Sequence, residues 1–305
     1  MTGGGITPPA TVAFIGLGQI GRPMCEQLIA AGHAVRAFDL SAEAVRAVAG
    51  RGAHAATSPA DAAGGAEAVL MSLPNHTVVE RVLFAADGVV AGLEPGAVVV
   101  DHSTCAPSAS KAIADRLRAR GTAMLDAPVS GGVARAERGA LAILVGGPGE
   151  ALERCRPLLE RLGETVLHIG GSGQGEAAKV LNNLLSATTL TATVEAVAVG
   201  MKAGIDPAVL VQVFNAGTAR SDASERKLPK HVLTRTFDSG FSLALMHKDL
   251  GLAAGLAADV GAPLRVTATA VELFAAAAAE LPEADHTEVA RTVERLAGVE
   301  DGGAG

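Results

Sequence analysis

The sequence contains no tryptophan and no tyrosine, and only seven of its 305 residues are phenylalanine. Proteins that bind single-stranded nucleic acid need aromatic side chains on which bases stack, together with a groove of one positive sign. Here the charges alternate in sign along the predicted helices and sum to −7. We therefore expect no nucleic-acid partner, and we take the net charge as a contribution to solubility.

Cysteine is also scarce. Cys25, Cys105 and Cys155 lie far apart, and no C-x-x-C pair occurs. This spacing excludes a disulfide framework and gives no zinc-type ligand cluster, so we expect no resident metal. Reduced cysteines that pack in the core of a cytoplasmic protein are the expectation.

Long apolar runs are missing as well. None reaches the ~20 residues that cross a bilayer, so we expect no membrane partner. Residues 1–9 lack the basic start and apolar core of a signal peptide. We expect these residues and the tail 301–305 to be frayed ends. A length of 305 residues and an apolar fraction of 49% suit two domains with well-buried cores.

One glycine-rich segment follows a strand-like run, 11–15, and precedes a helix-like stretch, 22–30. It consists of Gly16, Leu17, Gly18, Gln19, Ile20 and Gly21. A G-x-G-x-x-G segment in this setting is typical of dinucleotide binding, because its glycines allow a tight turn, a close pyrophosphate and close helix packing. An ordinary glycine-rich loop is the alternative. The context favours cofactor binding, with phosphates at the N-terminus of the helix.

Asp39 ends a second strand-like run and follows Gly21 by 18 residues. The carboxylate that binds the adenosine ribose is expected ~20 residues after the glycines. Such a carboxylate repels a 2′-phosphate, and Leu40 places no cation directly after it, so we favour NAD over NADP. Alternatively, Asp39 is the N-cap of a helix that starts near Ser41. The two roles can coexist.

The first half of the chain alternates apolar runs with helical patterns, which predicts a mostly parallel sheet covered on both faces. The predicted strands are 11–15, 34–38, 67–72, 97–101, 122–126, 141–145 and 165–169. A long helix is predicted over 176–203, followed by further helices with breaks near 204–207, 217, 238–240 and 261–263. The fold class is therefore α/β, a Rossmann-type doubly wound sheet followed by an all-helical C-terminal domain. We place the NAD-binding domain at 1–172 and a helical substrate and oligomerisation domain at 173–305.

Four polar residues share one face of the long helix. Lys179, Asn182, Asn183 and Ser186 stand at i, i+3, i+4 and i+7. A solvated helix face would look the same from spacing alone. The predicted position of the helix at the domain junction favours a functional face.

Four blocks of the sequence resemble the β-hydroxyacid dehydrogenases, the group of 3-hydroxyisobutyrate dehydrogenase and 2-hydroxy-3-oxopropionate reductase. The blocks are 16–24 (GLGQIGRPM), 126–133 (DAPVSGGV), 175–183 (GEAAKVLNN) and 248–253 (KDLGLA). They occur in the family's order and span residues 11 to about 255. One departure is Ile20, where many relatives have methionine, a swap of similar volume.

The resemblance implies a catalytic site. Lys179 would be the catalytic acid/base, and Asn183 would orient the substrate or the Lys179 ammonium. The substrate carboxylate would be held by Ser130, Gly131 and Gly132. The free ammonium has a pKa of ~10.4, so a base needs the depression that burial and a nearby nicotinamide cation provide.

The resemblance also extends the cofactor site to Leu73, Pro74, Val78 and Thr104, with Lys248 approaching from the helical domain. An ion pair of Lys248 with Asp249 is the alternative. We interpret His102 and Cys105 as strand-end neighbours of the cofactor. Arg220 lies in a loop, 214–222, that would face the substrate; it could meet a second anionic group, or it is simply solvated.

The leading hypothesis is an NAD-dependent oxidoreductase acting on a short 3-hydroxyacid. An NAD(P)H-dependent reductase of 2-hydroxy-3-oxopropionate, glyoxylate or succinic semialdehyde is the main alternative. An imine reductase is disfavoured by Lys179, and a catalytically idle nucleotide-binding regulator is disfavoured by Lys179 and Asn183. The expected partners are a small carboxylate substrate and further copies of the chain, as a homodimer or homotetramer.

Overall fold

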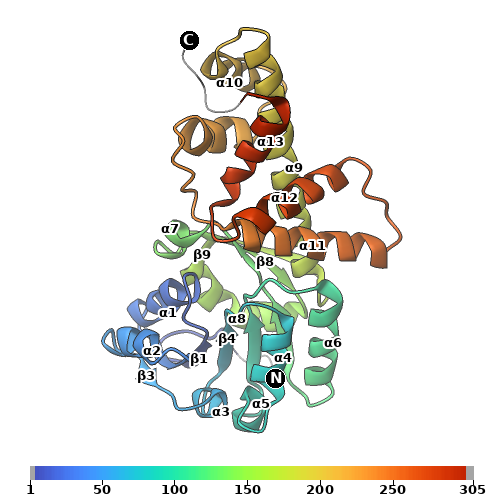
Figure 1. Ribbon diagram of the computed structural model, residues 1–305. Coiled ribbons are helices and arrows are strands. Elements are labelled where there is room, and N and C mark those ends of the chain that lie inside the picture. Colours follow the sequence, from blue (N-terminus) through green and yellow to red (C-terminus); the bar gives the residue numbers. More distant parts are fainter. Residues whose placement is uncertain (1–3, 300–305) are drawn as a thin grey trace. The chain divides into compact units, whose positions relative to one another are not determined.

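The computed structural model describes residues 4–299, so residues 1–3 of the predicted leader and the predicted tail 301–305 lie outside it. The chain forms two compact units that divide after Lys179. We call them the sheet unit, up to Lys179, and the helical unit, from Val180, and describe each by itself (Figure 1). The functional assignment of domains at 1–172 and 173–305 stays a prediction.

The sheet unit contains one nine-stranded sheet. Its strands are β1 Thr11–Ile15, β2 Ala34–Phe38, β3 His54–Ala55, β4 Ala68–Met71, β5 Val98–Asp101, β6 Ala123–Asp126, β7 Val129–Ser130, β8 Leu141–Gly146 and β9 Gly163–Gly170. The order is β3-β2-β1-β4-β5-β6-β8-β7, with β9 beside β8. The first six strands have the order of a dinucleotide-binding fold. The seven predicted strands are all present; the two-residue strands β3 and β7 were not predicted.

Most strand pairs are parallel, as predicted. Only β8 runs antiparallel to its neighbours β6 and β7, whereas β9 runs parallel to β8. The strands β4 and β5 are buried along their whole length, because helices cover both faces of the sheet.

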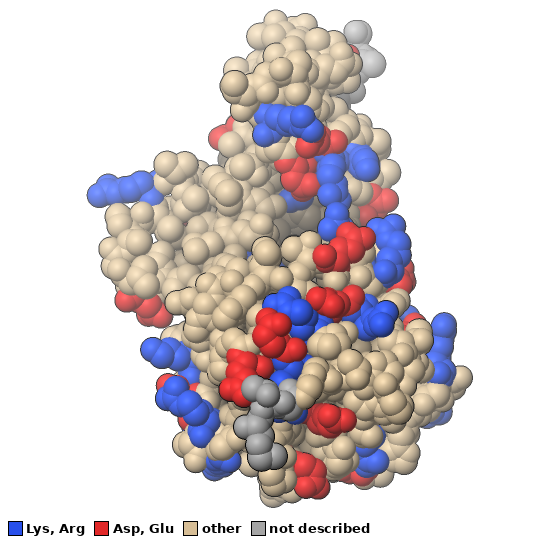
Figure 2. Space-filling model, turned by 180° about the vertical axis from the view of Figure 1, so that it is seen from behind, with Lys and Arg blue, Asp and Glu red and all other residues tan. Residues whose placement is uncertain are grey.

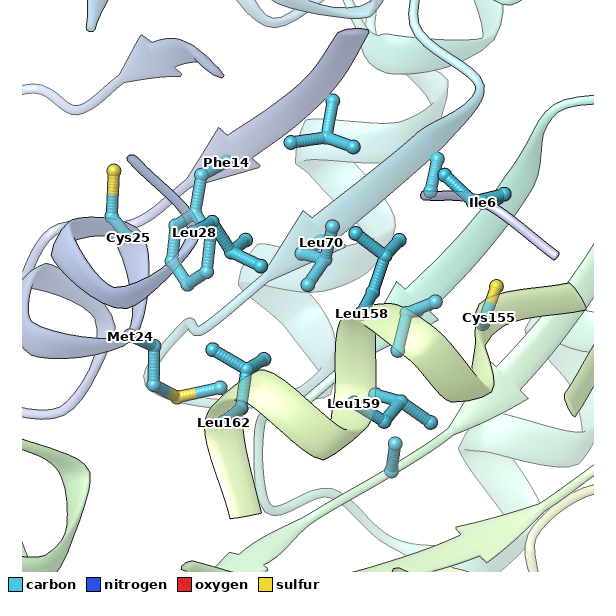
Figure 3. Packing of buried hydrophobic residues seen from close by; sticks show 14 of the residues in the cluster. Ile6, Phe14, Met24, Cys25, Leu28, Leu70, Cys155, Leu158, Leu159 and Leu162 are labelled. Carbon is cyan, nitrogen blue, oxygen red and sulfur yellow. The ribbon is translucent and has the colours of Figure 1, made fainter. Parts of the chain in front are cut away.

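Alternate strand residues point into two cores. Val12 and Phe14 of β1 belong to one core, and Ala13 and Ile15 belong to the other. The first core lies under α1 Gly21–Ala30, α2 Ala42–Ala49, α7 Val133–Ala136 and α8 Gly149–Leu162. The second lies under α3 Pro59–Ala63, α4 His76–Phe84, α5 Val89–Gly92 and α6 Pro107–Arg118. Figure 3 shows Phe14 and leucines of α8 packing in the first core.

As far as residue 299, the helical unit is built from helices and the loops between them, as predicted. The helices are the rest of α9 Gln174–Lys202, α10 Pro207–Ala216, the π-helix η1 Ala223–Val232, α11 Leu243–Asp259, α12 Thr267–Glu280, the short 3-10 helix η2 His286–Glu288 and α13 Val289–Ala297. The four predicted breaks are present, and a further one at 281–285, between α12 and η2, was not predicted. The core is built from small and aliphatic residues around Phe274, which is fully buried.

The helix α9 corrects one expectation. It is long and apolar enough to cross a bilayer by length and composition, and 44% of its most apolar window is buried. Its residues Val180, Leu184 and Leu190 build the core of the helical unit. A core helix passes the same test as a membrane span, so α9 is weak evidence for a membrane partner.

The charges on the surface are mixed. On the face in Figure 2, lysine and arginine stand among aspartate and glutamate rather than in a continuous stripe. Several charged residues of the sheet unit form exposed ion pairs, such as Arg156 with Glu153 and Arg116 with Glu80. Exposed pairs of this kind contribute little to stability.

Candidate functional site

The carboxyl ends of the central parallel strands lie side by side. Backbone amides just beyond one strand bond to carbonyls at the end of the next: Gly16 to Phe38 at 3.0 Å, Ser72 to Ile15 at 2.9 Å, His102 to Met71 at 2.8 Å and Ala127 to Asp101 at 2.7 Å. Ligands of open parallel sheets bind beyond this edge. The segments predicted to hold cofactor and substrate therefore start from one edge of the sheet.

The three glycines of the predicted phosphate loop have different surroundings. Gly16 has a φ of +94°, and a Cβ on it would collide with the carbonyl oxygen of Ser72. A Cβ on Gly21 would collide with the carbonyl oxygen of Gly16, whereas one on Gly18 would meet nothing within 4 Å. The first and third glycines thus pack the turn against the sheet and the helix. The open space at Gly18 fits the approach of a dinucleotide pyrophosphate.

Asp39 lies beside this loop. Its Oδ2 accepts a hydrogen bond from the amide of Leu17 at 2.6 Å, and its Oδ1 accepts one from the amide of Ser41 at 2.7 Å. The N-cap of α2 is Ser41, whose Oγ accepts from the amide of Ala44. The alternative that Asp39 is the N-cap is therefore wrong. Its carboxylate instead ties the end of β2 to the glycine loop.

The other predicted cofactor residues follow β4 and β5. The amide of Leu73 donates to Ser103 Oγ at 2.9 Å, which links the two strand ends. Pro74 comes next, and Val78 lies in the first turn of α4, where its amide donates to Asn75 Oδ1. Thr104 lies three residues after the end of β5. The structure thus brings these residues to one edge, and their contact with a cofactor stays a prediction.

The predicted carboxylate-binding segment begins on β7. Ser130 pairs with Ala142 of β8 and is followed by Gly131 and Gly132, with φ of +139° and +71°. A Cβ at Gly132 would meet nothing within 4 Å. Its left-handed conformation favours glycine and leaves the backbone N–H groups before α7 uncrowded.

Asp126 connects this segment to α9. Its Oδ1 accepts from the amide of Gly173 at 2.7 Å, and its Oδ2 accepts from the amide of Glu176 at 3.1 Å. Burial raises the pKa of this carboxyl, and the bonds from the amides oppose the rise. A Cβ on Gly175 would collide with the carbonyl oxygen of Leu144, so the start of α9 packs directly on the sheet. One carboxylate at the end of β6 therefore fixes the helix that carries Lys179.

The predicted polar face of α9 is partly buried. Lys179 is 8% exposed and Asn183 6% exposed, while Asn182 is exposed and Ser186 is half-buried. The alternative of a solvated helix face is therefore wrong for Lys179 and Asn183, which are buried, and holds for Asn182. Asn183 Nδ2 donates to Asp249 Oδ2 at 2.7 Å, and Asn183 Oδ1 accepts from Asn182. Asp249, which sequence reasoning used only as a partner of Lys248, thus orients the Asn183 amide.

Lys248 forms the ion pair with Asp249 that was the alternative to a cofactor contact. Its Nζ lies 3.4 Å from Asp249 Oδ1, and its side chain is 31% exposed. Arg220 likewise pairs with Glu225 and is 64% exposed, as a solvated loop arginine would be. An approach of Lys248 to the cofactor stays a prediction.

Asp101, Cys105 and Glu176 form a buried group that was not predicted. Their ligand atoms lie within 4.8 Å of one another, in contrast to the expectation that no ligand cluster exists. Asp101 already accepts bonds from the Ser103 amide and the Cys105 thiol, so we assign no metal to the group. Burial raises the pKa of Asp101 to about 6. Spacing could not have revealed a cluster drawn from two strand-end positions and a distant helix.

His102 is buried next to this group. Its Nδ1 lies 2.8 Å from the carbonyl oxygen of Ala127, and burial lowers the pKa of the imidazole to about 4. A neutral ring that bonds to the backbone of the neighbouring strand end stabilises that edge of the sheet.

Comparisons with known proteins match both parts of the chain. The family model described as the NAD binding domain of 6-phosphogluconate dehydrogenase matches residues 11–170. The one described as NAD-binding of NADP-dependent 3-hydroxyisobutyrate dehydrogenase matches residues 173–293.

Similar proteins match over nearly their whole length. The 2-(hydroxymethyl)glutarate dehydrogenase of Eubacterium barkeri is 36% identical, with 94% of this chain and 96% of that protein covered. The 3-hydroxyisobutyrate dehydrogenase of Pseudomonas aeruginosa is 39% identical, with 86% and 90% covered. A solved 3-hydroxyisobutyrate dehydrogenase of Mycobacterium tuberculosis with L-serine has a TM-score of 0.89 at 35% identity, with 93% and 99% covered. The chain therefore belongs to the β-hydroxyacid dehydrogenase family and is an NAD(P)-dependent oxidoreductase of small hydroxyacids.

Proposed function

We propose that this enzyme transfers a hydride between NAD and a short 3-hydroxyacid, with Lys179 as the general acid/base. The observation that carries the proposal is the position of this amine. Lys179 is buried on the helix that Asp126 anchors, and Asp126 stands four residues before Ser130 in the chain. The proposed base and the proposed carboxylate-binding segment thus extend from the same strand end.

When bound, the nicotinamide takes the hydride in oxidation and supplies it in reduction. The proton is handled by the protein. In oxidation Lys179 Nζ takes the hydroxyl proton, and in reduction the ammonium donates a proton to the oxygen that gains charge.

Substrate binding in this proposal uses two elements. Ser130 and the amides of Gly131 and Gly132 hold the carboxylate, and Asn183 positions the reacting end. The bond from Asn183 Nδ2 to Asp249 fixes the amide plane, since one of its two N–H bonds then has a set direction.

For the cofactor, we propose NAD over NADP. The residues that would hold it are Gly16, Leu17, Gly18, Gln19, Ile20, Gly21, Asp39, Leu73, Pro74, Val78 and Thr104, with Lys248 near it. The Asp39 carboxylate would accept from the ribose hydroxyls and repel a 2′-phosphate. Leu40, which follows it, is 85% exposed and offers no positive charge.

The main alternative is a semialdehyde reductase, which uses the same groups in the opposite direction. The two differ in substrate and physiological direction rather than in site chemistry. The retained Lys179 continues to disfavour an imine reductase.

The assembly that we propose is a homodimer or homotetramer. The helix α9 exposes Leu181, Leu185 and Val199, at 48%, 63% and 69%, along one side. Exposed apolar side chains that gather on one helix are typical of subunit interfaces. The helical domain, 173–305, would then serve substrate binding and oligomerisation, and 1–172 would bind NAD. Three buried cysteines suit a cytoplasmic enzyme.

The test is a screen for NADH formation over 3-hydroxyisobutyrate, 3-hydroxypropionate, serine, glycerate, threonate and sulfonated analogues, followed by the Lys179→Ala variant. We expect turnover to fall by about 10²- to 10⁴-fold, the usual contribution of a general acid/base, while NAD affinity changes little. Lys202→Ala is the matched control, because Lys202 lies on the same helix and is exposed. Unchanged turnover in Lys179→Ala would remove this residue from the mechanism.

A further inference from the structure

A second lysine contacts the face of α9 that carries the proposed catalytic residues. Lys227, on the π-helix η1, donates from Nζ to Ser186 Oγ at 2.7 Å. Its side chain is only 12% exposed. Because lysine is rarely buried without a partner of opposite charge, the charges near Lys227 decide what this position can do.

The carboxylates near Lys227 neutralise it only in part. Asp222 Oδ2 lies 3.8 Å from Nζ, beyond hydrogen-bond distance, and the Asp222 side chain is 51% exposed and also pairs with Arg226. Asp285 is the other nearby carboxylate, but it accepts bonds from Ser239, Gly240, Phe241 and Thr287. Burial lowers the pKa of Lys227, and Asp222 opposes this effect. The nearer carboxylate is thus solvent-screened and beyond hydrogen-bond distance, and the other already accepts bonds from four other residues, so this buried cation favours a further anion.

The hydrogen-bond donors that Lys227 and Ser186 still offer suit such an anion. An ammonium has three donors, and the bond to Ser186 uses one of them. The Ser186 hydroxyl, as the acceptor of that bond, keeps its own hydrogen to donate. Lys227 and Ser186 together therefore offer donors to an oxyanion next to α9.

The position along α9 relates this pair to the reaction. Ser186 follows Asn183 by three residues and Lys179 by seven, so all three share one helix face. At 1.5 Å per residue, Ser186 lies ~10 Å along the axis from Lys179. A substrate group at Ser186 would thus be several bonds away from a hydroxyl at Lys179.

We propose that Lys227 and Ser186 bind a second anionic group of the substrate, a carboxylate or sulfonate, so that the enzyme prefers dianionic to monoanionic hydroxyacids. The proposal rests on the proposed function and deepens it. It also replaces Arg220, whose pairing with Glu225 and high exposure make it less suited to this role.

The experiment compares steady-state kinetics on matched substrates. These are 2-(hydroxymethyl)alkanedioates of increasing length, the same acids with the remote carboxylate as an amide, and analogues with a remote sulfonate. We expect the wild type to have a KM at least about tenfold lower for the dianions, equal to ~1.4 kcal/mol of binding. Lys227→Met should abolish this preference and leave the kinetics of the monoamides nearly unchanged. Ser186→Ala should lose part of it.

Two controls make the result specific. Lys230→Met carries the same substitution at an exposed position of η1 and should keep the preference. Asp222→Asn removes the competing carboxylate and should lower the KM of the dianions, whatever happens to the fold of Lys227→Met. Equal preference for sulfonate and carboxylate dianions would mean that the site recognises negative charge alone. A preference for one of them would identify the group that the site binds.

The proposal is overturned if the wild type shows no preference for dianions, or if Lys227→Met retains it. In either case oxidation of the monoamides leaves the proposed function standing. If the wild type oxidises no hydroxyacid at all, the proposed function fails, and the second-anion site fails with it.

Discussion

The two units place their polar residues by different means. In the sheet unit, Asp39, Asp101 and Asp126 stand at or next to the ends of parallel strands, and their partners are mostly backbone amides. In the helical unit the comparable contacts are side-chain pairs between distant helices. Asn183 reaches Asp249 across 66 residues, and Ser186 meets Lys227 across 41. The polar residues are therefore positioned by backbone geometry in one unit and by matched side chains in the other.

The largest expected effect tests the backbone half of this comparison. Gly16→Ala puts a methyl group against the Ser72 carbonyl at a positive φ, so it should lower the free energy of unfolding by more than about 3 kcal/mol. Gly18→Ala is the matched substitution in the same loop, where the added methyl group meets nothing within 4 Å. It should leave stability within about 1 kcal/mol and weaken NAD binding about tenfold or more.

Urea denaturation and NAD titration of both variants measure these effects. Equal loss of stability in the two variants would mean that the loop is packed tightly at both glycines. Intact NAD affinity in Gly18→Ala would place the pyrophosphate elsewhere.

The same contrast explains what the sequence could predict. The seven longer strands, four of the breaks between helices and the glycine loop follow from local patterns, because parallel strands buried on both faces appear in the sequence as short apolar runs. The strands β3 and β7 have two residues each and leave no periodicity. The cap of α2 was uncertain between Asp39 and Ser41 because both residue types cap helices, and only the bond from Ala44 decides it.

The candidate site was predictable to a similar extent. The resemblance named residues of four blocks, and the strand ends bring the ones in the sheet unit to one edge. The roles of Asp249 toward Asn183 and of Lys227 toward Ser186 were missed, since nothing local marks a partner dozens of residues away. The buried group of Asp101, Cys105 and Glu176 was missed for the same reason.

The next largest effect tests the side-chain half. Asp249→Ala leaves the buried Asn183 amide without its acceptor, which should cost about 2–3 kcal/mol of unfolding free energy. It should also lower kcat more than it raises KM, because Asn183 then no longer holds a fixed orientation. Asp259→Ala, at the exposed end of the same helix, is the control and should change neither. Normal kcat in Asp249→Ala would show that Asn183 needs no partner to act.

The smallest effect is a difference in acid sensitivity between the units. Burial lowers the pKa of His102 and of His286 to about 4, so each unit loses stability as the pH falls below the unfolded value of 6.5. In the sheet unit Asp101 opposes this loss. Its pKa is raised to about 6, so the folded sheet unit takes up a proton at Asp101 before the unfolded chain does. This uptake stabilises the folded unit increasingly as the pH falls from 6 toward the ordinary value of 3.8. In the helical unit burial acts to raise the pKa of Asp285, but its hydrogen bonds outweigh burial and lower it, so this carboxyl gives no compensation and adds to the loss only below its ordinary value of 3.8.

Between pH 7 and pH 5 we therefore expect the helical unit to lose about 2 kcal/mol and the sheet unit clearly less. Hydrogen-exchange mass spectrometry at several urea concentrations reads the two units separately. Asp101→Asn should remove the compensation and make the sheet unit about 1 kcal/mol more sensitive over the same interval, without changing the helical unit. A sheet unit whose pH profile is the same with aspartate and asparagine at position 101 would mean that this carboxyl keeps its charge in the folded protein. The hydrogen bonds from backbone amides would then stabilise the charged form of the strand-end carboxylates by more than burial destabilises it.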